Sequence, residues 1–179
     1  DEYNTNNEAY VAWAWDGGTS TVSNTDGTIT SSVRASASKG FSIVSYTGNG
    51  TSGATVGHGL NAAPNFIIVK KRNAADDWPI YTSARGATKF VRLNLDNAEG
   101  DNANRWNDTE PTSSVFSLGN HTEVNNNADT YIAYCWTAID GYCEVGSYEG
   151  NGSTDGRFVL TKLRPTWLLV KRTDSTAGW

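Results

Sequence analysis

The stretch from residue 102 to residue 108 holds the side chains best suited to a recognition chemistry. It reads NANRWND, which is a single aromatic ring among amides, a guanidinium and a carboxylate. A ring that stacks on a sugar, flanked by planar hydrogen-bonding groups, is a common way to bind carbohydrate. The candidate carbohydrate-binding residues are therefore Asn104, Arg105, Trp106, Asn107 and Asp108. The alternative is that Trp106 folds back to cap the core, because aromatic side chains are usually buried.

Several carboxylates lie in and beside the same polar loop. They are Asp96, Glu99, Asp101, Asp108 and Glu110. A glycosidase sets two carboxylates across a sugar ring, but a solvated acidic loop has the same composition. The sequence contains no Gly-x-Ser-x-Gly elbow and no phosphate-binding glycine loop with a lysine. We therefore expect a protein that is not an enzyme and has no catalytic residues.

The histidines and cysteines do not predict a metal site. His58 and His121 are the only histidines, whereas zinc needs three or four convergent ligands. Cys135 and Cys143 are too few for a disulfide scaffold. Both align with small residues in an internal repeat, so we expect buried thiols that serve as small apolar groups. We expect neither a metal nor another cofactor.

The overall composition is that of a β protein. Gly, Ser, Thr and Asn account for 73 of the 179 residues, and Leu occurs 8 times. Such a chain is poor in helix formers and rich in residues that favour strands and turns. The net charge of −5 argues against nucleic-acid binding, which needs a basic face. No apolar run of about 20 residues predicts membrane insertion.

The chain contains an internal repeat, and the strands that must position the candidate residues belong to it. Residues 40–78 match residues 141–179 in order. The offset is 101 between Trp78 and Trp179. It is 102 for the Tyr-x-Gly-Asn-Gly motif that begins at Tyr46, so an insertion or deletion of one residue lies between the two positions. So many identities in order indicate a repeated unit.

A second match divides the chain into parts. Residues 10–15, YVAWAW, match residues 131–136, YIAYCW, at an offset of 121. We therefore expect residues 1–39 to be the end of one repeat plus a hairpin insert. Residues 40–140 are expected to be a complete β repeat, and residues 141–179 the start of the next. We expect the chain to be a fragment of a longer array.

Short apolar runs predict the strands. Residues 66–69 and 167–170 follow prolines and are typical of central strands buried on both faces. Further strands are expected at residues 41–46, 89–95, 115–118, 131–136 and 142–148, with a polar hairpin at residues 21–30. This pattern predicts an all-β fold, an antiparallel, jelly-roll-like β-sandwich built from tandem pseudo-repeats. No segment predicts a convincing helix.

The repeat motifs carry a family resemblance. They are the segments at residues 46–50, 56–60, 64–70 and 131–136. In combination they resemble a repeated domain of unknown function found in tail-fibre-like and other structural proteins of marine tailed bacteriophages. The resemblance covers nearly the whole chain. It implies a non-enzymatic, oligomeric protein of the virion surface, and it supplies no binding residues.

These observations favour a virion structural protein, a segment of a tail fibre or similar appendage. One alternative is a lectin-like module that binds host glycans through the residues around Trp106. Another is a capsid decoration or head-fibre protein. The expected partners are further copies of the chain, in a trimer, together with other virion proteins. In the lectin-like alternative a host surface glycan is a further partner.

Overall fold

The sequence folds into short antiparallel strands joined by turns. The structure, a computed structural model, describes residues 4–179. Within that range the strands are β1 (Thr21–Asn24), β2 (Ser31–Ser36), β3 (Phe41–Thr47), β4 (Ala54–Gly57), β5 (Phe66–Lys71), β6 (Pro79–Thr82), β7 (Lys89–Arg92), β8 (Gly100–Asp101), β9 (Val115–Leu118) and β10 (Thr130–Trp136). The helical elements are single turns, η1 (Ala37–Lys39) and α1 (Thr122–Asn125). The prediction of a nearly all-β fold with antiparallel sheets is confirmed.

Strand β10 is paired along both of its edges. It runs antiparallel to β3 on one side, where Cys135 lies opposite Ser42, and to β5 on the other, where Cys135 lies opposite Ile67. Alternate β10 residues are buried, as the pleat of a sheet with one core face requires. The strands expected at residues 41–46, 66–69 and 131–136 are confirmed.

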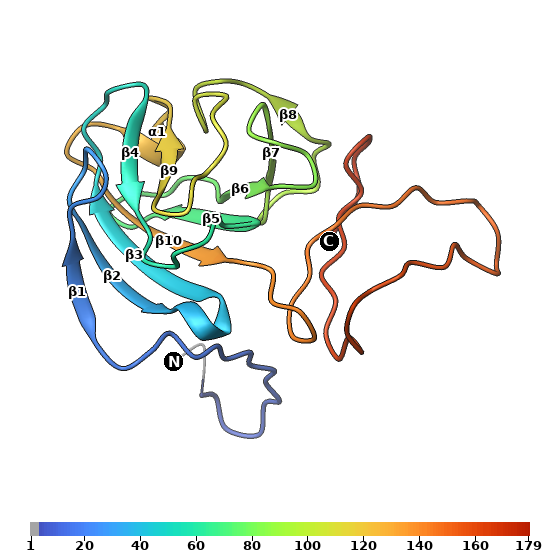
Figure 1. Cartoon of the computed structure of the whole chain (residues 1–179). Coiled ribbons are helices and arrows are strands. Elements are labelled where there is room, and N and C mark those ends of the chain that lie inside the picture. The colour runs from blue at the N-terminus through green and yellow to red at the C-terminus, as the bar shows by residue number, and fades with distance from the viewer. Residues whose placement is uncertain (1–3) are drawn as a thin grey trace.

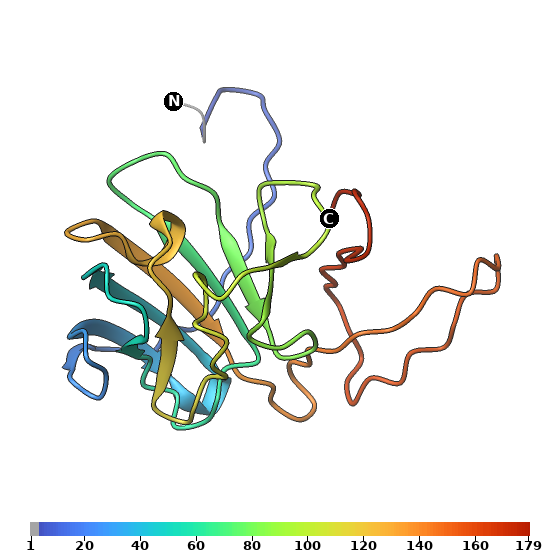
Figure 2. The same ribbon diagram turned by 90° about the horizontal axis from the view of Figure 1, so that it is seen from above.

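The strands form one large sheet and one small one (Figure 1). The large sheet has the order β1-β2-β3-β10-β5-β6-β7-β8, so the last strand of the chain lies at its centre. The small sheet is the pair β4–β9. Seen from above, β9 and α1 lie in front of strands of the large sheet (Figure 2). This placement lets the small sheet cover one face of the large one.

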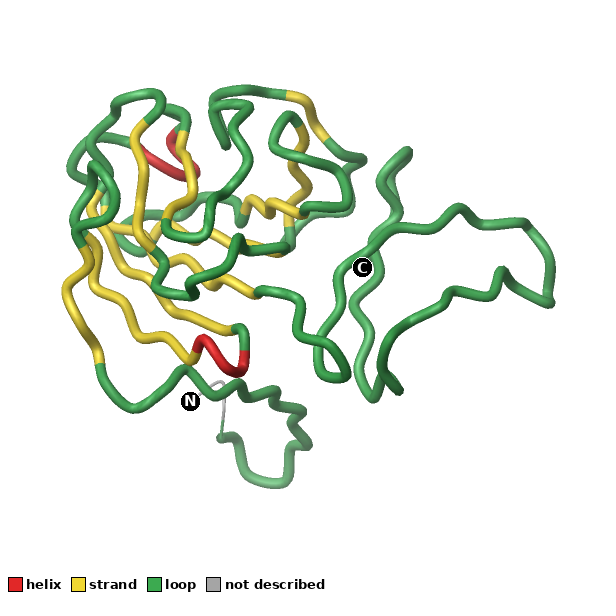
Figure 3. The backbone as a smooth tube through the Cα atoms, viewed as in Figure 1, coloured by secondary structure: helices red, strands yellow, loops and turns green. Residues whose placement is uncertain are grey.

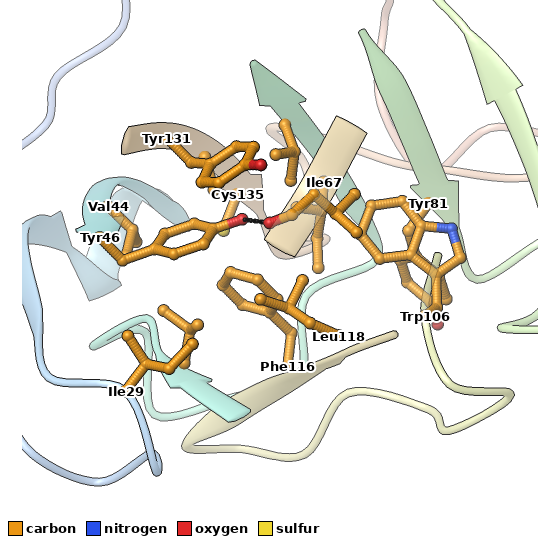
Figure 4. Packing of buried hydrophobic residues seen from close by; sticks show 14 of the residues in the cluster. Ile29, Val44, Tyr46, Ile67, Tyr81, Trp106, Phe116, Leu118, Tyr131 and Cys135 are labelled. Atoms are coloured by element: carbon orange, nitrogen blue, oxygen red, sulfur yellow. Dashed lines mark hydrogen bonds between the residues drawn. The ribbon is translucent and has the colours of Figure 1, made fainter. Parts of the chain in front are cut away.

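The main core lies between the two sheets (Figure 4). Tyr46 and Tyr131 stack at 5.3 Å between ring centroids, and Phe116 of β9 meets Tyr46 edge-on at 6.2 Å. The buried hydroxyl of Tyr46 donates a hydrogen bond of 2.8 Å to the carbonyl oxygen of Val124. Because that donor is satisfied, the tyrosine ring can be buried at little cost.

The opposite face of the large sheet is also apolar. Ile68, Ile80 and Val91 are buried there. The partly buried side chains packed against them are Phe66, Trp78, Leu93, Tyr134 and Trp136. The expectation that the central strands are buried on both faces is thus met for β5.

The polar hairpin differs in detail from the prediction. Strand β1 pairs with β2 from Asn24 opposite Ser31, so the turn extends well beyond Asp26 and Gly27. Ile29, expected in the second strand, instead forms a parallel bridge with Val56 and is buried in the core. A buried isoleucine side chain outweighs the few hydrogen bonds of a tighter hairpin.

The prediction of buried strands at residues 167–170 and 142–148 is wrong for this chain. Residues 141–179, here named the C-terminal arm, form no strand and extend from the body of the protein (Figure 3). Trp167 is 47% exposed and Leu168 69% exposed. In the first copy, the segment that matches residues 167–170 is β5, which lies between β10 and β6. The segment that matches residues 142–148 is β3, which lies between β2 and β10. No neighbouring strand pairs with the arm within residues 4–179, so its backbone has no ladder to join.

Replacing Ile67 by Ala should lower the free energy of unfolding by about 2–5 kcal/mol, because its side chain is fully buried and would leave a cavity. Leu168 is its match in the C-terminal arm, so Leu168→Ala should change stability by less than about 0.5 kcal/mol. Urea unfolding at a concentration where the chain is monomeric measures both variants. Equal losses would contradict the contrast between the strand and the arm.

Candidate assembly site

The proposed carbohydrate-binding residues do not form an open platform. Trp106 is 2% exposed, and its ring packs edge-on against Tyr81 at 6.1 Å (Figure 4). Arg105 is buried as well, whereas Asn104 and Asp108 are exposed and Asn107 is half-buried. The expectation that Trp106 offers a free ring face is therefore wrong, and the alternative that it folds back into the core is what the structure shows. The ring anchors the loop.

Arg105 belongs to a buried ion cluster centred on Glu123 of α1. The Nε of Arg105 donates to Oε2 of Glu123 at 2.8 Å, and Arg92 of β7 donates to Oε1 through Nε at 3.1 Å and Nη2 at 2.8 Å. Both guanidinium groups lie over the ring of Phe90, at 4.3 and 4.9 Å from its centroid. Burial raises the pKa of Glu123, but the two arginines more than offset this and lower it overall. The cluster fastens the loop and α1 to the large sheet.

Three of the acidic residues of the loop, Glu99, Asp101 and Glu110, have separate structural partners. Glu99 pairs with Arg85 at 2.6 Å, and Asp101 pairs with Lys89 at 2.8 Å. Glu110 accepts hydrogen bonds from the hydroxyl of Tyr81 and, at 2.7 Å, from the backbone N–H of Ala87. The tyrosine pKa is raised by its burial and by this carboxylate. These carboxylates tie the loop to the sheet instead of converging on one point.

The histidines have structural contacts. His58 is fully buried; its Nδ1 accepts from the backbone N–H of Leu60 at 3.2 Å, and its Nε2 lies 3.2 Å from the carbonyl oxygen of Thr112. Burial lowers the pKa of His58, so the ring is neutral near pH 7. His121 caps α1 by accepting from the N–H of Glu123 at 3.2 Å. Across residues 4–179, no group of three or more His, Cys, Asp or Glu side chains could hold a metal ion.

The two cysteines are free thiols in different settings. Cys135 is buried in β10, and burial raises its pKa to about 12, which makes the thiol unreactive. This matches the expectation of a small apolar group. Cys143 is only partly buried, at the start of the C-terminal arm.

The exposed aromatic side chains gather where the two ends of the chain meet the large sheet. Trp15 lies 5.7 Å from Trp136 of β10, 6.1 Å from Phe41 of β3 and 5.9 Å from Trp167 of the C-terminal arm, between ring centroids. Trp13 also lies 6.4 Å from Trp167. We name these five side chains the aromatic junction. Trp13 is 60% exposed and Trp167 47%, whereas Phe41 is buried, so only the outer side of the junction is open to solvent.

The C-terminal arm touches the body at a second place. The N–H of Glu99 donates to the carbonyl oxygen of Thr173 at 2.8 Å, and the N–H of Ala177 donates to that of Asp96 at the same distance. Trp179 donates from Nε1 to the carbonyl oxygen of Arg92 at 2.9 Å. The arm therefore lies beside the loop that follows β7, with most of its apolar side chains still exposed.

Several turns of the first copy recur in the arm at the repeat offsets. Gly50 and Gly152 have φ values of 70° and 68°, both in the left-handed region. The N–H of Thr51 donates to Asn49 Oδ1 at 2.9 Å, and the N–H of Ser153 donates to Asn151 Oδ1 at 3.1 Å. The turn geometry is thus present in both copies although the strands are not.

A further pair of contacts recurs in the same way. Lys70 donates from Nζ to the carbonyl oxygen of Asp76 at 3.0 Å, and Lys171 donates to that of Ala177 at 2.5 Å. The two lysines and the two acceptors are each 101 residues apart. A turn of this size depends on local sequence alone, which explains why it forms without neighbouring strands.

Some anchoring residues gave no signal in the sequence. Glu123 and Arg92 are isolated charges far apart in the chain, and only the fold brings them together. Asn125 is another, since its side chain is buried and bonds to the backbone of Asn49, Thr51 and Gly119. By contrast, the match of residues 10–15 with β10 was a usable signal for the aromatic junction.

The chain is a nearly all-β protein in which several exposed aromatic side chains from its two end segments meet beside the large sheet. A family model described as a domain of unknown function (DUF7483) matches residues 1–179, so the chain belongs to that family. No curated protein and no solved structure matches it. The helices within residues 4–179 are too short to cross a membrane.

Trp106→Ala should lower the free energy of unfolding by about 3–5 kcal/mol, because it empties a buried site next to Tyr81. Trp106→Phe is the matched control and should cost clearly less, since it keeps a ring in the core. Denaturant unfolding of both variants gives the comparison. A Trp106→Ala protein as stable as the wild type would contradict the anchoring role.

Acidification should destabilise the fold. The Glu123 carboxyl has a lower pKa in the fold than its ordinary value of 4.5, so the unfolded chain takes up the proton first as the pH falls. The stability that it contributes is complete above pH 4.5 and is lost as the pH falls through the folded pKa. The lowered pKa of His58 acts in the same direction below its ordinary 6.5. Urea unfolding between pH 7 and pH 3 should show a steady loss, and a gain in acid would contradict it.

Proposed function

We propose that the protein is a non-enzymatic structural component of a tailed-phage virion, a segment of a tail fibre or similar appendage. In this proposal the two sheets pack as a jelly-roll-like β-sandwich and form one complete unit of a tandem array. The complete unit is residues 40–140 with the preceding hairpin. Residues 10–15 and the C-terminal arm belong to adjacent units.

The observation that carries the proposal is the pair of exposed apolar stretches whose sequences match buried strands. Residues 10–15 match β10, and residues 167–170 match part of β5. A soluble monomer seldom exposes such stretches unless another protein covers them. Covering by adjacent units and other chains is what an elongated, repetitive assembly provides. We therefore infer a homo-oligomer, expected from the sequence to be a trimer, in contact with other virion proteins.

The recurring turns support the tandem arrangement. The Gly-Asn-Gly turn and the lysine contact keep their geometry at the repeat offsets. Two segments that have the same turn geometry and the same order of matching residues are expected if they are two copies of one structural unit. The strands of the second copy would form once their neighbours in the sheet are present.

The buried contacts of the polar loop around Trp106 support a structural role. Arg105 and Trp106 are buried, and the carboxylates of Glu99, Asp101 and Glu110 are each paired within the fold. The lectin-like alternative would need a surface other than the Trp106 ring. It can be separated by titrating host surface polysaccharide, where saturable binding weakened by Asp108→Ala would favour it.

Immunogold electron microscopy with antibodies to the chain tests the proposal on purified virions of the phage that encodes it. Label along a tail appendage is the expected result. Label on the capsid would favour the decoration-protein alternative, and virions that carry no label would contradict a structural role. A capsid-only antibody serves as the positional control.

A further inference from the structure

The described chain contains three apolar stretches without a strand partner. They are residues 10–15, residues 142–148 and residues 167–171, and none of them forms a strand. Their exposed side chains include Tyr10, Trp13, Tyr142, Tyr148, Trp167 and Leu168. By the repeat offsets they match β10, β3 and β5 respectively. These are the strands that pair with one another in the complete unit.

The register of the complete unit can be transferred to these stretches. In the large sheet, Trp136 at the end of β10 lies opposite Phe41 of β3 and opposite Phe66 of β5. The corresponding residues are Trp15, Tyr142 and Trp167. Residues 10–15 therefore fit as a central strand, antiparallel to residues 142–148 on one side, where the one extra residue forms a bulge, and to residues 167–171 on the other.

One contact of this arrangement is already present. The rings of Trp15 and Trp167 lie 5.9 Å apart, close to the 5.6 Å between their matches Trp136 and Phe66. The turn after residue 148 also has the geometry of the turn after β3. The C-terminal arm thus already has one ring contact and one turn of the geometry that it would have beside a strand formed by residues 10–15.

We propose that residues 10–15 of one chain insert as a β-strand between residues 142–148 and 167–171 of a second copy of the chain. Within one chain, Trp15 packs on Phe41 and Trp136 of the body and also touches Trp167 of the C-terminal arm, but residues 10–15 share no backbone hydrogen bond with that arm. A strand from a second copy leaves those contacts in place in the donor's own body. It buries the aromatic side chains of both stretches and pairs their backbone N–H and C=O groups, once the bridge that joins Cys143 to Ile139 at 2.9 Å has opened.

Each chain in this scheme has one donor segment and one acceptor arm. The joint is therefore head-to-tail, which closes into a ring or extends as a filament according to the rotation between copies. The inference rests on the tandem-repeat part of the proposed function and adds the partner, the segment and the register of the joint. Its test is independent of where the protein lies in a virion.

The register provides a sharp test through native Cys143. In the complete unit Cys135 lies opposite Ser42, so Ala14 should lie opposite Cys143 of the second copy. Directly opposite residues in an antiparallel pair are about 4.5–5.5 Å apart between Cα atoms, within the range that a disulfide spans. Ala14→Cys should therefore form a disulfide between chains when oxidised glutathione is added. Val11→Cys, three residues away, is the matched control.

Both variants are made with Cys135→Ala, which puts at position 135 the residue that occupies position 14 in the matching segment. Non-reducing electrophoresis should show dimers and larger species for Ala14→Cys, at least tenfold more than for Val11→Cys, and peptide mapping should find the 14–143 linkage. A linkage within one chain, or equal cross-linking of the two variants, would overturn the proposal.

A second variant tests the strand without a thiol. Proline has no N–H and is excluded from the middle of a sheet, so Ala12→Pro should abolish assembly in analytical ultracentrifugation. Ala12 lies outside the core, so the unfolding midpoint of the body should stay unchanged. Assembly equal to that of the wild type would overturn the proposal, whatever immunogold labelling shows about the virion.

Discussion

Pairing of β10 along both edges is the constraint on which the rest of the structure depends. The last strand of the fold closes the large sheet by entering between β3 and β5, which are separated in sequence by β4 and its flanking loops. Its inward side chains, Tyr131, Ala133 and Cys135, then form the middle of the main core. Without this strand, β3 and β5 would each lose a full ladder of hydrogen bonds and half of their packing partners.

The same constraint explains why two matching sequences of the repeat behave differently. The β5 sequence is buried where β10 and β6 flank it, and its match in the C-terminal arm is exposed where neither is present. A strand is stable only as part of a sheet, so sequence alone does not settle its state. Turns depend on local residues, and they recur in both copies.

This difference also marks how far the sequence could predict the fold. The apolar runs located β3, β5, β9 and β10, because their patterns of alternation or continuous burial are strong. The exposed state of residues 142–148 and 167–170 could not be read from their patterns, since it depends on missing neighbours. The loop around Trp106 looked like a binding surface because its sequence is polar. The loop is instead fixed to the body, because Arg105 bonds to Glu123, a single charge that is distant in sequence and belongs to no motif.

Hydrogen exchange as a function of protein concentration tests the central claim that a β10-type strand is ordered only when both neighbours are present. In dilute solution the amides of β10 should be protected, while those of residues 10–15, 144–148 and 167–171 exchange freely. On assembly these three segments should become protected together. Protection of residues 10–15 in the dilute monomer, or assembly that leaves all three segments unprotected, would contradict the account.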